Sequence, residues 1–174
     1  MKKTKVINFF SGPSSGKSTS AAKLFSELKT EGVNCELVTE FAKDEVWSGN
    51  IDRLKDQIHV FGNHHHRFWR LIGKVDLIVT DSPILMSIAY TDPSESILID
   101  LIYAKHKYFD NFNIWVNRVS KYNPVGRTQD EAEALEKDVE IANLLADYDE
   151  KTHLKSSKSD NLISNEKLKN FINR

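Results

Sequence analysis

The stretch Ser11-Gly12-Pro13-Ser14-Ser15-Gly16-Lys17-Ser18 near the start of the chain has the residue types and spacing of a phosphate-binding loop. A glycine-containing loop that closes on Gly-Lys-Ser can direct its backbone N–H groups at phosphate oxygens. We expect Lys17 to reach the β- and γ-phosphates of a nucleoside triphosphate, and the Ser18 hydroxyl to bind Mg2+. The consensus G-x-x-x-x-G-K-[ST] is met except at Ser11, which stands where the first glycine belongs.

The residues on either side of this loop place it between a strand and a helix. Residues 5–10 form a short apolar run, which is typical of a buried strand. After the loop, Ala21, Ala22, Leu24 and Phe25 recur at helical spacing. The start of that helix would add its own N–H groups to the phosphate site. The residues expected to bind the nucleotide are therefore Gly12, Pro13, Ser14, Ser15, Gly16, Lys17, Ser18 and Thr19. The alternative is a glycine-rich connection that carries a lysine by chance.

Composition limits the classes of protein to which the chain can belong. Its 174 residues are 40% hydrophobic and 28% charged, as expected of one soluble globular domain. A net charge of −1 gives no long-range attraction to nucleic acid or to an anionic membrane. The single Cys35 excludes an internal disulfide and suits a reducing compartment. No apolar run is long enough to span a membrane, so we expect a cytoplasmic protein.

Predicted strands alternate with predicted helices along the chain. Strands are expected at residues 5–10, 35–39, 75–80 and 112–117, with a weak fifth at 153–155, and helices at about 18–31, 51–72, 84–90, 93–104, 128–142 and 165–173. This order predicts an α/β fold, a three-layer α/β/α sandwich with a central parallel sheet, as a single domain spanning residues 1–174. In such sheets ligands bind beyond the carboxyl ends of the strands.

Local patterns set the expected starts and faces of these helices. Asp92 is expected to cap the helix that begins at Pro93, with Glu95 in its first turn. Thr128 and Glu131 have the spacing of a capping box for the following helix. Its expected apolar positions include Ala132, Leu135, Val139 and Ala142, and those of the helix at 51–72 are Leu54, Ile58, Phe61, His65, Phe68 and Ile72.

Two carboxylates follow predicted strands at the edge where the phosphate loop lies. Asp81 follows the apolar run 75–80, where it could help to hold Mg2+. Glu40 follows the second strand and could accept a proton from an attacking hydroxyl. Asp44 is a weaker candidate for that role. The alternatives are a turn aspartate for Asp81 and a solvated loop carboxylate for Glu40.

Cations are needed around a phosphoryl group in transfer, and two arginines are candidates. Arg118 and Arg127 bracket a polar stretch whose composition suits a mobile lid at about residues 119–128. Such a lid could exclude water from the phosphates. Lys121 is a weaker candidate in the same stretch, and ordinary surface arginines are the alternative.

The run His64-His65-His66-Arg67-Phe68-Trp69-Arg70 is the most unusual in the chain. Consecutive histidines on a helix point in different directions, so these three cannot chelate one metal ion together. The helix would flank an acceptor site, where Arg67 or Arg70 could hold a phosphate. Phe61, His65 or Phe68 could stack on a base. A packed helix with a solvated basic side is an equal alternative, and Trp47 is either an acceptor contact or simple packing.

With these residues placed, the chain resembles the P-loop kinases of the nucleoside and nucleoside-monophosphate kinase group. More closely, it looks like small bacteriophage-type ATPase/kinases related to the nicotinamide riboside kinase domain. The resemblance implies that Lys17 and Ser18 hold ATP and Mg2+, with Glu40 as the acceptor-side catalytic carboxylate and Asp81 as the third-strand carboxylate. Arg118 and Arg127 match the lid arginines approximately.

One departure concerns the end of the third strand, where the chain has Asp81-Ser82-Pro83 in place of a Glu-Arg-Ser or Asp-Arg-Tyr signature. This counts against a standard thymidylate or deoxynucleoside kinase. Some phage relatives phosphorylate a base hydroxyl within DNA, which the resemblance also allows.

These observations favour an enzyme that transfers the γ-phosphoryl group of ATP to a nucleoside, a nucleotide or a modified base, including a hydroxymethylated base in phage DNA. The alternative is an ATPase whose hydrolysis acts on a partner protein or nucleic acid. A nucleotide-binding regulatory module without catalysis is a third hypothesis. We expect a monomer or a homodimer in the cytoplasm, which would be the host cytoplasm for a phage protein.

Overall fold

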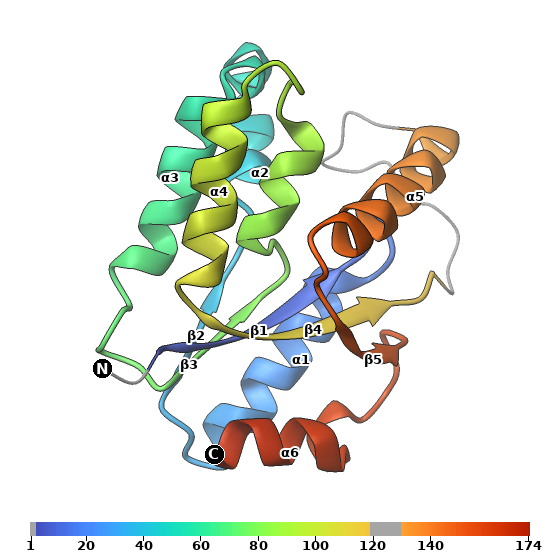
Figure 1. Cartoon of the computed structure of the whole chain (residues 1–174). Helices are drawn as coiled ribbons and strands as arrows, with labels where there is room; N and C mark the ends of the chain where they lie inside the picture. Colours follow the sequence, from blue (N-terminus) through green and yellow to red (C-terminus); the bar gives the residue numbers. More distant parts are fainter. Residues whose placement is uncertain (1–2, 119–129) are drawn as a thin grey trace.

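The computed structural model describes residues 3–118 and 130–174, and these form one five-stranded sheet with helices on both faces (Figure 1). The strands are β1 (Lys5–Phe10), β2 (Cys35–Val38), β3 (Leu77–Thr80), β4 (Asp110–Val116) and β5 (Thr152–Ser156). The α-helices are α1 (Lys17–Thr30), α2 (Phe41–Trp47), α3 (Gln57–Trp69), α4 (Ser96–Lys107), α5 (Glu131–Asp147) and α6 (Glu166–Asn173), and the 3-10 helices are η1 (Ile51–Lys55), η2 (Ile84–Tyr90) and η3 (Leu162–Ser164).

The sheet has the order β2-β3-β1-β4-β5, and every neighbouring pair is parallel. Helices α1 and α6 lie on one face, and α3, α4 and α5 lie on the other (Figure 1). The predicted three-layer α/β/α sandwich with a parallel sheet is therefore confirmed, including the weak fifth strand. Because all strands run the same way, the ends of β1, β2, β3 and β4 bring their loops to a common edge.

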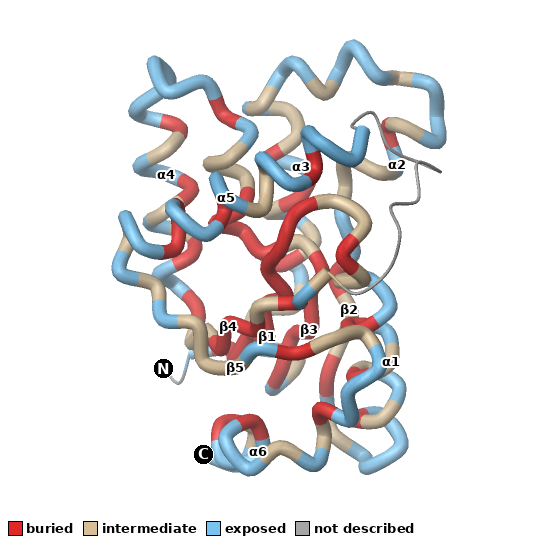
Figure 2. The backbone as a smooth tube through the Cα atoms, turned by 90° about the vertical axis from the view of Figure 1, so that its right-hand side faces the viewer, coloured by how far each residue is buried: buried red, intermediate tan, exposed pale blue. Residues whose placement is uncertain are grey.

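The core is built by strands whose side chains are buried on both faces. Ile7 and Phe9 of β1 pack toward α1 and α6, whereas Val6 packs toward α3 and α4, and Phe10 toward α5. All six residues of β1 are buried, as expected of a central strand in a parallel sheet. Figure 2 shows the buried strands between helices whose outer sides are exposed. This packing fixes the start of the phosphate loop, which follows Phe10 directly.

The long helix after the fourth strand presents a different face from the one predicted. Ala134, Ile141, Leu144 and Leu145 are the buried residues of α5, whereas Leu135 is 51% exposed and Val139 is 62% exposed. Ala132 and Ala142 are also exposed. The capping box is formed by Asp130 and Glu133, so the predicted pair of Thr128 and Glu131 is wrong. The apolar pattern of this helix is too sparse to fix its phase from sequence.

Two further predictions about helices are corrected by the structure. The expected helix at 51–72 is divided into η1 and α3, and Ile58 is 68% exposed on its outer side. The helix after η2 begins at Ser96, because the Asp92 carboxylate accepts bonds from the backbone N–H and hydroxyl of Ser94 and closes a turn instead. The side chain of Ile97, in the first turn of this helix, is 85% exposed.

The remaining predictions about whole elements agree with the structure within a few residues. The last helix is capped by Asn165, whose side chain accepts bonds from Lys167 and Leu168 backbone N–H groups. No helix among residues 3–118 and 130–174 has the length and apolar character needed to cross a membrane. The predicted lid at about residues 119–128 lies outside the described residues.

Candidate active site

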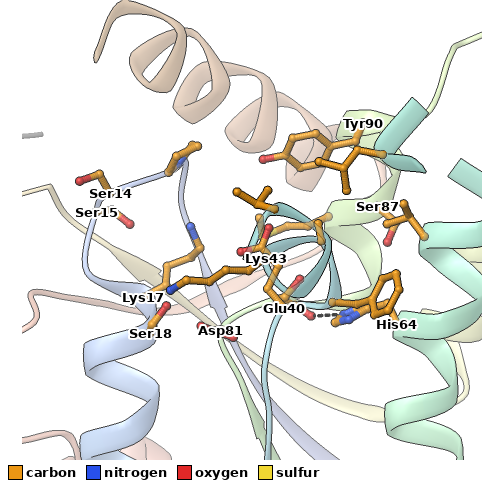
Figure 3. A pocket seen from close by; sticks show the side chains of 18 of the residues that line it. Ser14, Ser15, Lys17, Ser18, Glu40, Lys43, His64, Asp81, Ser87 and Tyr90 are labelled. Carbon is orange, nitrogen blue, oxygen red and sulfur yellow. Dashed lines mark hydrogen bonds between the residues drawn. The ribbon is translucent and has the colours of Figure 1, made fainter. Parts of the chain in front are cut away.

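A cavity of about 400 Å3 opens at the sheet edge where β1, β2 and β3 end (Figure 3). Its lining begins at the phosphate loop and continues onto α2, α3 and η2. The lining residues are Pro13, Ser14, Ser15, Gly16, Lys17, Ser18, Thr19, Glu40, Phe41, Ala42, Lys43, Val46, Leu54, Gln57, Val60, His64, Asp81, Ser82, Met86, Ser87 and Tyr90. The structure thus brings the predicted loop, Glu40 and Asp81 together around one space.

The phosphate loop curls around the side chain of Lys17. Its Nζ donates to the carbonyl oxygens of Ser11 and Gly12, each at 2.8 Å. Positive φ angles at Ser14 (63°) and Gly16 (105°) make the curl, and a side chain at position 16 would also collide with Lys158. Lys17 is therefore held at the centre of the loop.

The electrostatic environment of Lys17 is set by burial and by three carboxylates. Burial lowers the pKa of Lys17 to about 8, although Glu40, Asp81 and Asp138 act to raise it. An ammonium group with a lowered pKa is under-solvated, so an incoming phosphate would supply charge that the loop lacks. The site is thus prepared for an anion.

Ser18 and Asp81 offer the oxygen atoms that Mg2+ prefers. Asp81 is buried, and its Oδ1 has no hydrogen-bond partner within the described part of the chain. Ser18 lies in the first turn of α1 and lines the same cavity as Asp81. A buried carboxylate oxygen without a donor fits a site for a hydrated cation. The residues present therefore suit Mg2+ bound together with nucleotide phosphates.

Glu40 is positioned by the junction between β2 and α2. It is the N-cap residue of α2 and lines the cavity. Arg67 of α3 holds this junction, because it donates to the carbonyl oxygen of Thr39 at 3.1 Å and to the Thr39 hydroxyl at 3.2 Å. Its guanidinium also pairs with Asp44 and lies 5.4 Å from the ring centre of Phe41. Asp44 is thus held by an arginine, whereas Glu40 faces the cavity.

The turn that carries Asp81 is held by His64 of α3. The Nε2 of His64 donates to the carbonyl oxygen of Ser82 at 2.7 Å, shown as a dashed line in Figure 3. Thr80 Oγ1 donates to the same carbonyl and accepts from the Ser82 backbone N–H. Burial lowers the pKa of His64 to about 4, so its ring is neutral at neutral pH. His64 therefore fixes the Asp81 turn without adding charge.

The side chains expected to contact an acceptor from α3 lie elsewhere. Phe61, His65, Arg67 and Arg70 are absent from the cavity lining, and Phe61 is buried in the core beside α4. Arg70 is exposed and donates to the carbonyl oxygen of Arg67. Trp47 is 64% exposed. The role of the four α3 residues as acceptor contacts stays a prediction.

The face of α3 that reaches the cavity carries Gln57, Val60 and His64. Their spacing of three and four residues is a helical stripe, offset from the stripe that sequence reasoning selected. Phe61 and Phe68 are buried and anchor the helix on the core. The signal in the sequence is the spacing of Gln57, Val60 and His64, which places them on one side of the helix, next to its most apolar side.

Tyr90 closes the cavity from η2, and its phenol points into the space in Figure 3. Burial raises the pKa of Tyr90, and the carboxylates of Glu40, Glu140 and Asp138 raise it further. The phenol therefore keeps its proton and can donate a hydrogen bond to a ligand. Lys137 Nζ lies 4.8 Å from the ring centre, on the side of α5.

Arg118, the first of the two predicted lid arginines, contacts the phosphate loop. Its Nη1 donates to the carbonyl oxygen of Pro13 at 2.7 Å, and its Nη2 pairs with Asp138 of α5 at 2.8 Å. Arg118 is not among the residues that line the cavity. Arg127 lies outside the described residues. A direct role for either arginine in phosphoryl transfer stays a prediction.

Two solved structures share this fold along nearly the whole chain. Thymidylate kinase from Ehrlichia chaffeensis superposes with a TM-score of 0.59 at 16% identity, over 98% of this chain and 95% of that chain. An APS kinase from Mycobacterium tuberculosis, in complex with AMPPNP and APS, gives a TM-score of 0.50 at 13% identity over 100% of both chains. No family model matches the sequence, and no curated protein matches it either. At these identities, the likeness shows the fold, an α/β/α sandwich with a parallel sheet that the chain shares with these two kinases.

Proposed function

We propose that the chain is an ATP-dependent phosphotransferase that moves the γ-phosphoryl group to a nucleoside, a nucleotide or a modified base. The observation that carries this proposal is the continuous cavity, in which Lys17 and Ser18 share one space with Glu40 and Asp81. An ATPase has no need for a cavity that continues beyond the phosphate loop onto α2, α3 and η2. The fold shared with a thymidylate kinase and an APS kinase adds support.

In this proposal the phosphate loop binds ATP and the two carboxylates divide the remaining work. Lys17 and the loop N–H groups hold the phosphates, and Ser18 and Asp81 hold Mg2+. The metal ion, when bound, neutralises charge that develops on the phosphates. Glu40 accepts the proton of the acceptor hydroxyl while the hydroxyl oxygen bonds to the γ-phosphorus. The bond from the γ-phosphorus to the β-γ bridging oxygen breaks at the same time. ADP leaves with that electron pair.

The polar and charged residues of the cavity favour a hydroxyl as the acceptor group over a phosphate. Among the described residues that line the cavity, Lys17 and Lys43 are the cations. In this proposal Lys17 binds the phosphates of ATP. A second phosphate between Glu40 and Asp81 would face repulsion with little compensation. Lys43 of α2 extends toward the phosphate loop in Figure 3, where its charge suits the migrating group.

The rest of the cavity suits a flat, partly polar molecule. Apolar side chains of α2, η1, α3 and η2 form its walls, and these are Phe41, Val46, Leu54, Val60 and Met86. Gln57, Ser87 and Tyr90 add groups that form hydrogen bonds. This combination is typical of sites for a nucleoside-like ring with hydroxyls. A hydroxymethylated base in phage DNA remains within the proposed class, since its acceptor group is also a hydroxyl.

A transfer assay tests the proposal directly. The protein is incubated with γ-labelled ATP, Mg2+ and a panel of nucleosides, nucleoside monophosphates and DNA with hydroxymethylated bases. We expect label on a hydroxyl acceptor, and Lys17→Ala should abolish it, because the loop loses its phosphate-binding cation. Release of free phosphate alone, stimulated by a partner protein or nucleic acid, would replace the proposal with the ATPase alternative.

A further inference from the structure

The start of the phosphate loop is held by a carboxylate from a helix that is distant in sequence. Asp138 of α5 accepts hydrogen bonds from the Ser11 hydroxyl at 3.0 Å and from the Gly12 backbone N–H. Ser11 is 1% exposed, so its hydroxyl has no access to water as a substitute partner. The serine that replaces the consensus glycine therefore joins the loop to α5, together with the Gly12 backbone N–H.

Glycine at position 12 permits the same close approach. A Cβ atom there would lie 2.6 Å from the carbonyl oxygen of Ala134 and 2.8 Å from Asp138 Oδ1. The first of these neighbours is backbone and cannot swing aside. The loop backbone thus lies directly against α5, and Gly12 fits between them because it has no side chain.

Arg118 completes the arrangement and neutralises the carboxylate. Its Nε and Nη2 donate to Asp138 Oδ2 at 3.2 and 2.8 Å, and its Nη1 donates to the carbonyl oxygen of Pro13. The side chains of Arg118 and Asp138 are only 14% and 19% exposed. A bidentate pair at low exposure is geometrically specific. Without that arginine, a carboxylate beside an anion-binding loop would oppose phosphate binding.

We propose that Asp138 is a positioning residue for nucleotide binding, which acts through Ser11, Gly12 and Arg118. It holds the first turn of the phosphate loop so that the later N–H groups of the loop converge on the phosphates. It also joins the end of β4 and helix α5 to the loop as one unit. This role rests on the proposed function, since it requires that the loop bind ATP.

The test measures the dissociation constant of Mg-ATP by calorimetry without any acceptor. Asp138→Asn should weaken binding about tenfold or more, because it removes the charge that holds Arg118. Ser11→Ala should weaken binding several-fold. The double variant Ser11→Ala/Asp138→Ala should be no weaker than Asp138→Ala alone, because alanine at position 138 leaves the Ser11 hydroxyl no oxygen to which it can donate. Glu136→Gln, an exposed carboxylate two residues away on α5, should bind ATP like the wild type.

If the effects of the Ser11 and Asp138 substitutions on ATP affinity are not additive, the two residues act together on the loop. A general loss of stability would instead lower the melting temperature, and the two effects on ATP affinity would not be coupled. If Asp138→Asn fails to fold, Ser11→Ala decides: unchanged ATP affinity in that variant overturns the role. Equal affinity in wild type and all variants also overturns it, and leaves the proposed function intact. A wild-type protein that does not bind Mg-ATP overturns the proposed function and this role with it.

Discussion

Lys17 is held in the place where it would meet phosphates before any nucleotide arrives. Two loop carbonyl oxygens accept from its ammonium group, and burial lowers its pKa to about 8. Phosphates would provide the negative charge that favours the protonated form. The pKa of Lys17 should therefore rise when ATP binds, and binding should take up a proton wherever the free lysine is already deprotonated.

Proton uptake by Lys17 is measurable as a pH-dependent binding enthalpy. At pH 8.5 most free Lys17 is deprotonated, so Mg-ATP binding should take up a large part of about one proton. Calorimetry in two buffers of different ionisation enthalpy gives this number. Lys17→Arg should show no such uptake, because a guanidinium stays charged at this pH. Equal uptake in both proteins would assign the proton to another group.

Residue types at the site were predictable where a motif or a strand end places them. Lys17 and Ser18 belong to the loop motif, Glu40 and Asp81 come after β2 and β3, and all four line the cavity. Asp138 belongs to no motif and follows no strand. It is 127 residues from Ser11 in sequence, so their contact is formed only by the tertiary fold. Its place on α5 depends on the phase of that helix, which the sequence pattern predicted wrongly.

At the scale of elements, a buried polar network joins β1, β4 and α4. Asn8 of β1 donates to Asn113 of β4, and Asn113 donates to Glu150 after α5. His106 of α4 lies 3.1 Å from Glu150 and is 1% exposed. These strands lead to the phosphate loop and to Arg118, so the network supports two elements that border the candidate active site.

Glu150 should stabilise the fold in a pH-dependent way. Burial acts to raise its pKa, but His106 and Asn113 outweigh that effect and hold the pKa below its usual value. A lowered carboxyl pKa adds stability above the unfolded-state value, and that stability is lost as pH falls through the folded-state value. Glu150→Gln should lower the unfolding free energy at pH 7 by about 1–3 kcal/mol.

Urea denaturation at pH 7 and at acid pH checks this behaviour. The difference between wild type and Glu150→Gln should shrink as the pH falls below the usual range of a glutamate. Glu136→Gln, at an exposed position on α5, serves as the matched control and should change stability little at either pH. A difference that persists unchanged in acid would show that packing, and not charge, is the source.

Helices were harder to predict than strands for a physical reason. Strands buried on both faces, such as β1 and β3, consist mostly of apolar residues, so they can be recognised without knowing which side of the strand faces the core. An amphipathic helix needs its buried side identified, and exposed apolar residues such as Ile58, Ile97 and Val139 obscure it. The stripe of α3 that lines the cavity was missed for this reason.

At the scale of the whole molecule, the parallel sheet brings separate segments to one edge. β1, β2 and β3 end at the phosphate loop, Glu40 and Asp81, and α2, α3 and η2 close the space above them. The order of elements made this convergence predictable. The part of the cavity away from the phosphate loop is walled by α2, η1, α3 and η2. How these helices pack together cannot be predicted from the spacing of residues in the sequence.

We propose that Glu40 activates an acceptor hydroxyl in this cavity. The single-turnover rate of γ-phosphoryl transfer to the acceptor found in the panel tests it most directly. We predict that Glu40→Gln lowers this rate by about two orders of magnitude or more, with little change in Mg-ATP affinity. Asp44→Asn should transfer nearly as fast as the wild type, since Arg67 holds that carboxylate. Unchanged transfer by Glu40→Gln would contradict this role of Glu40.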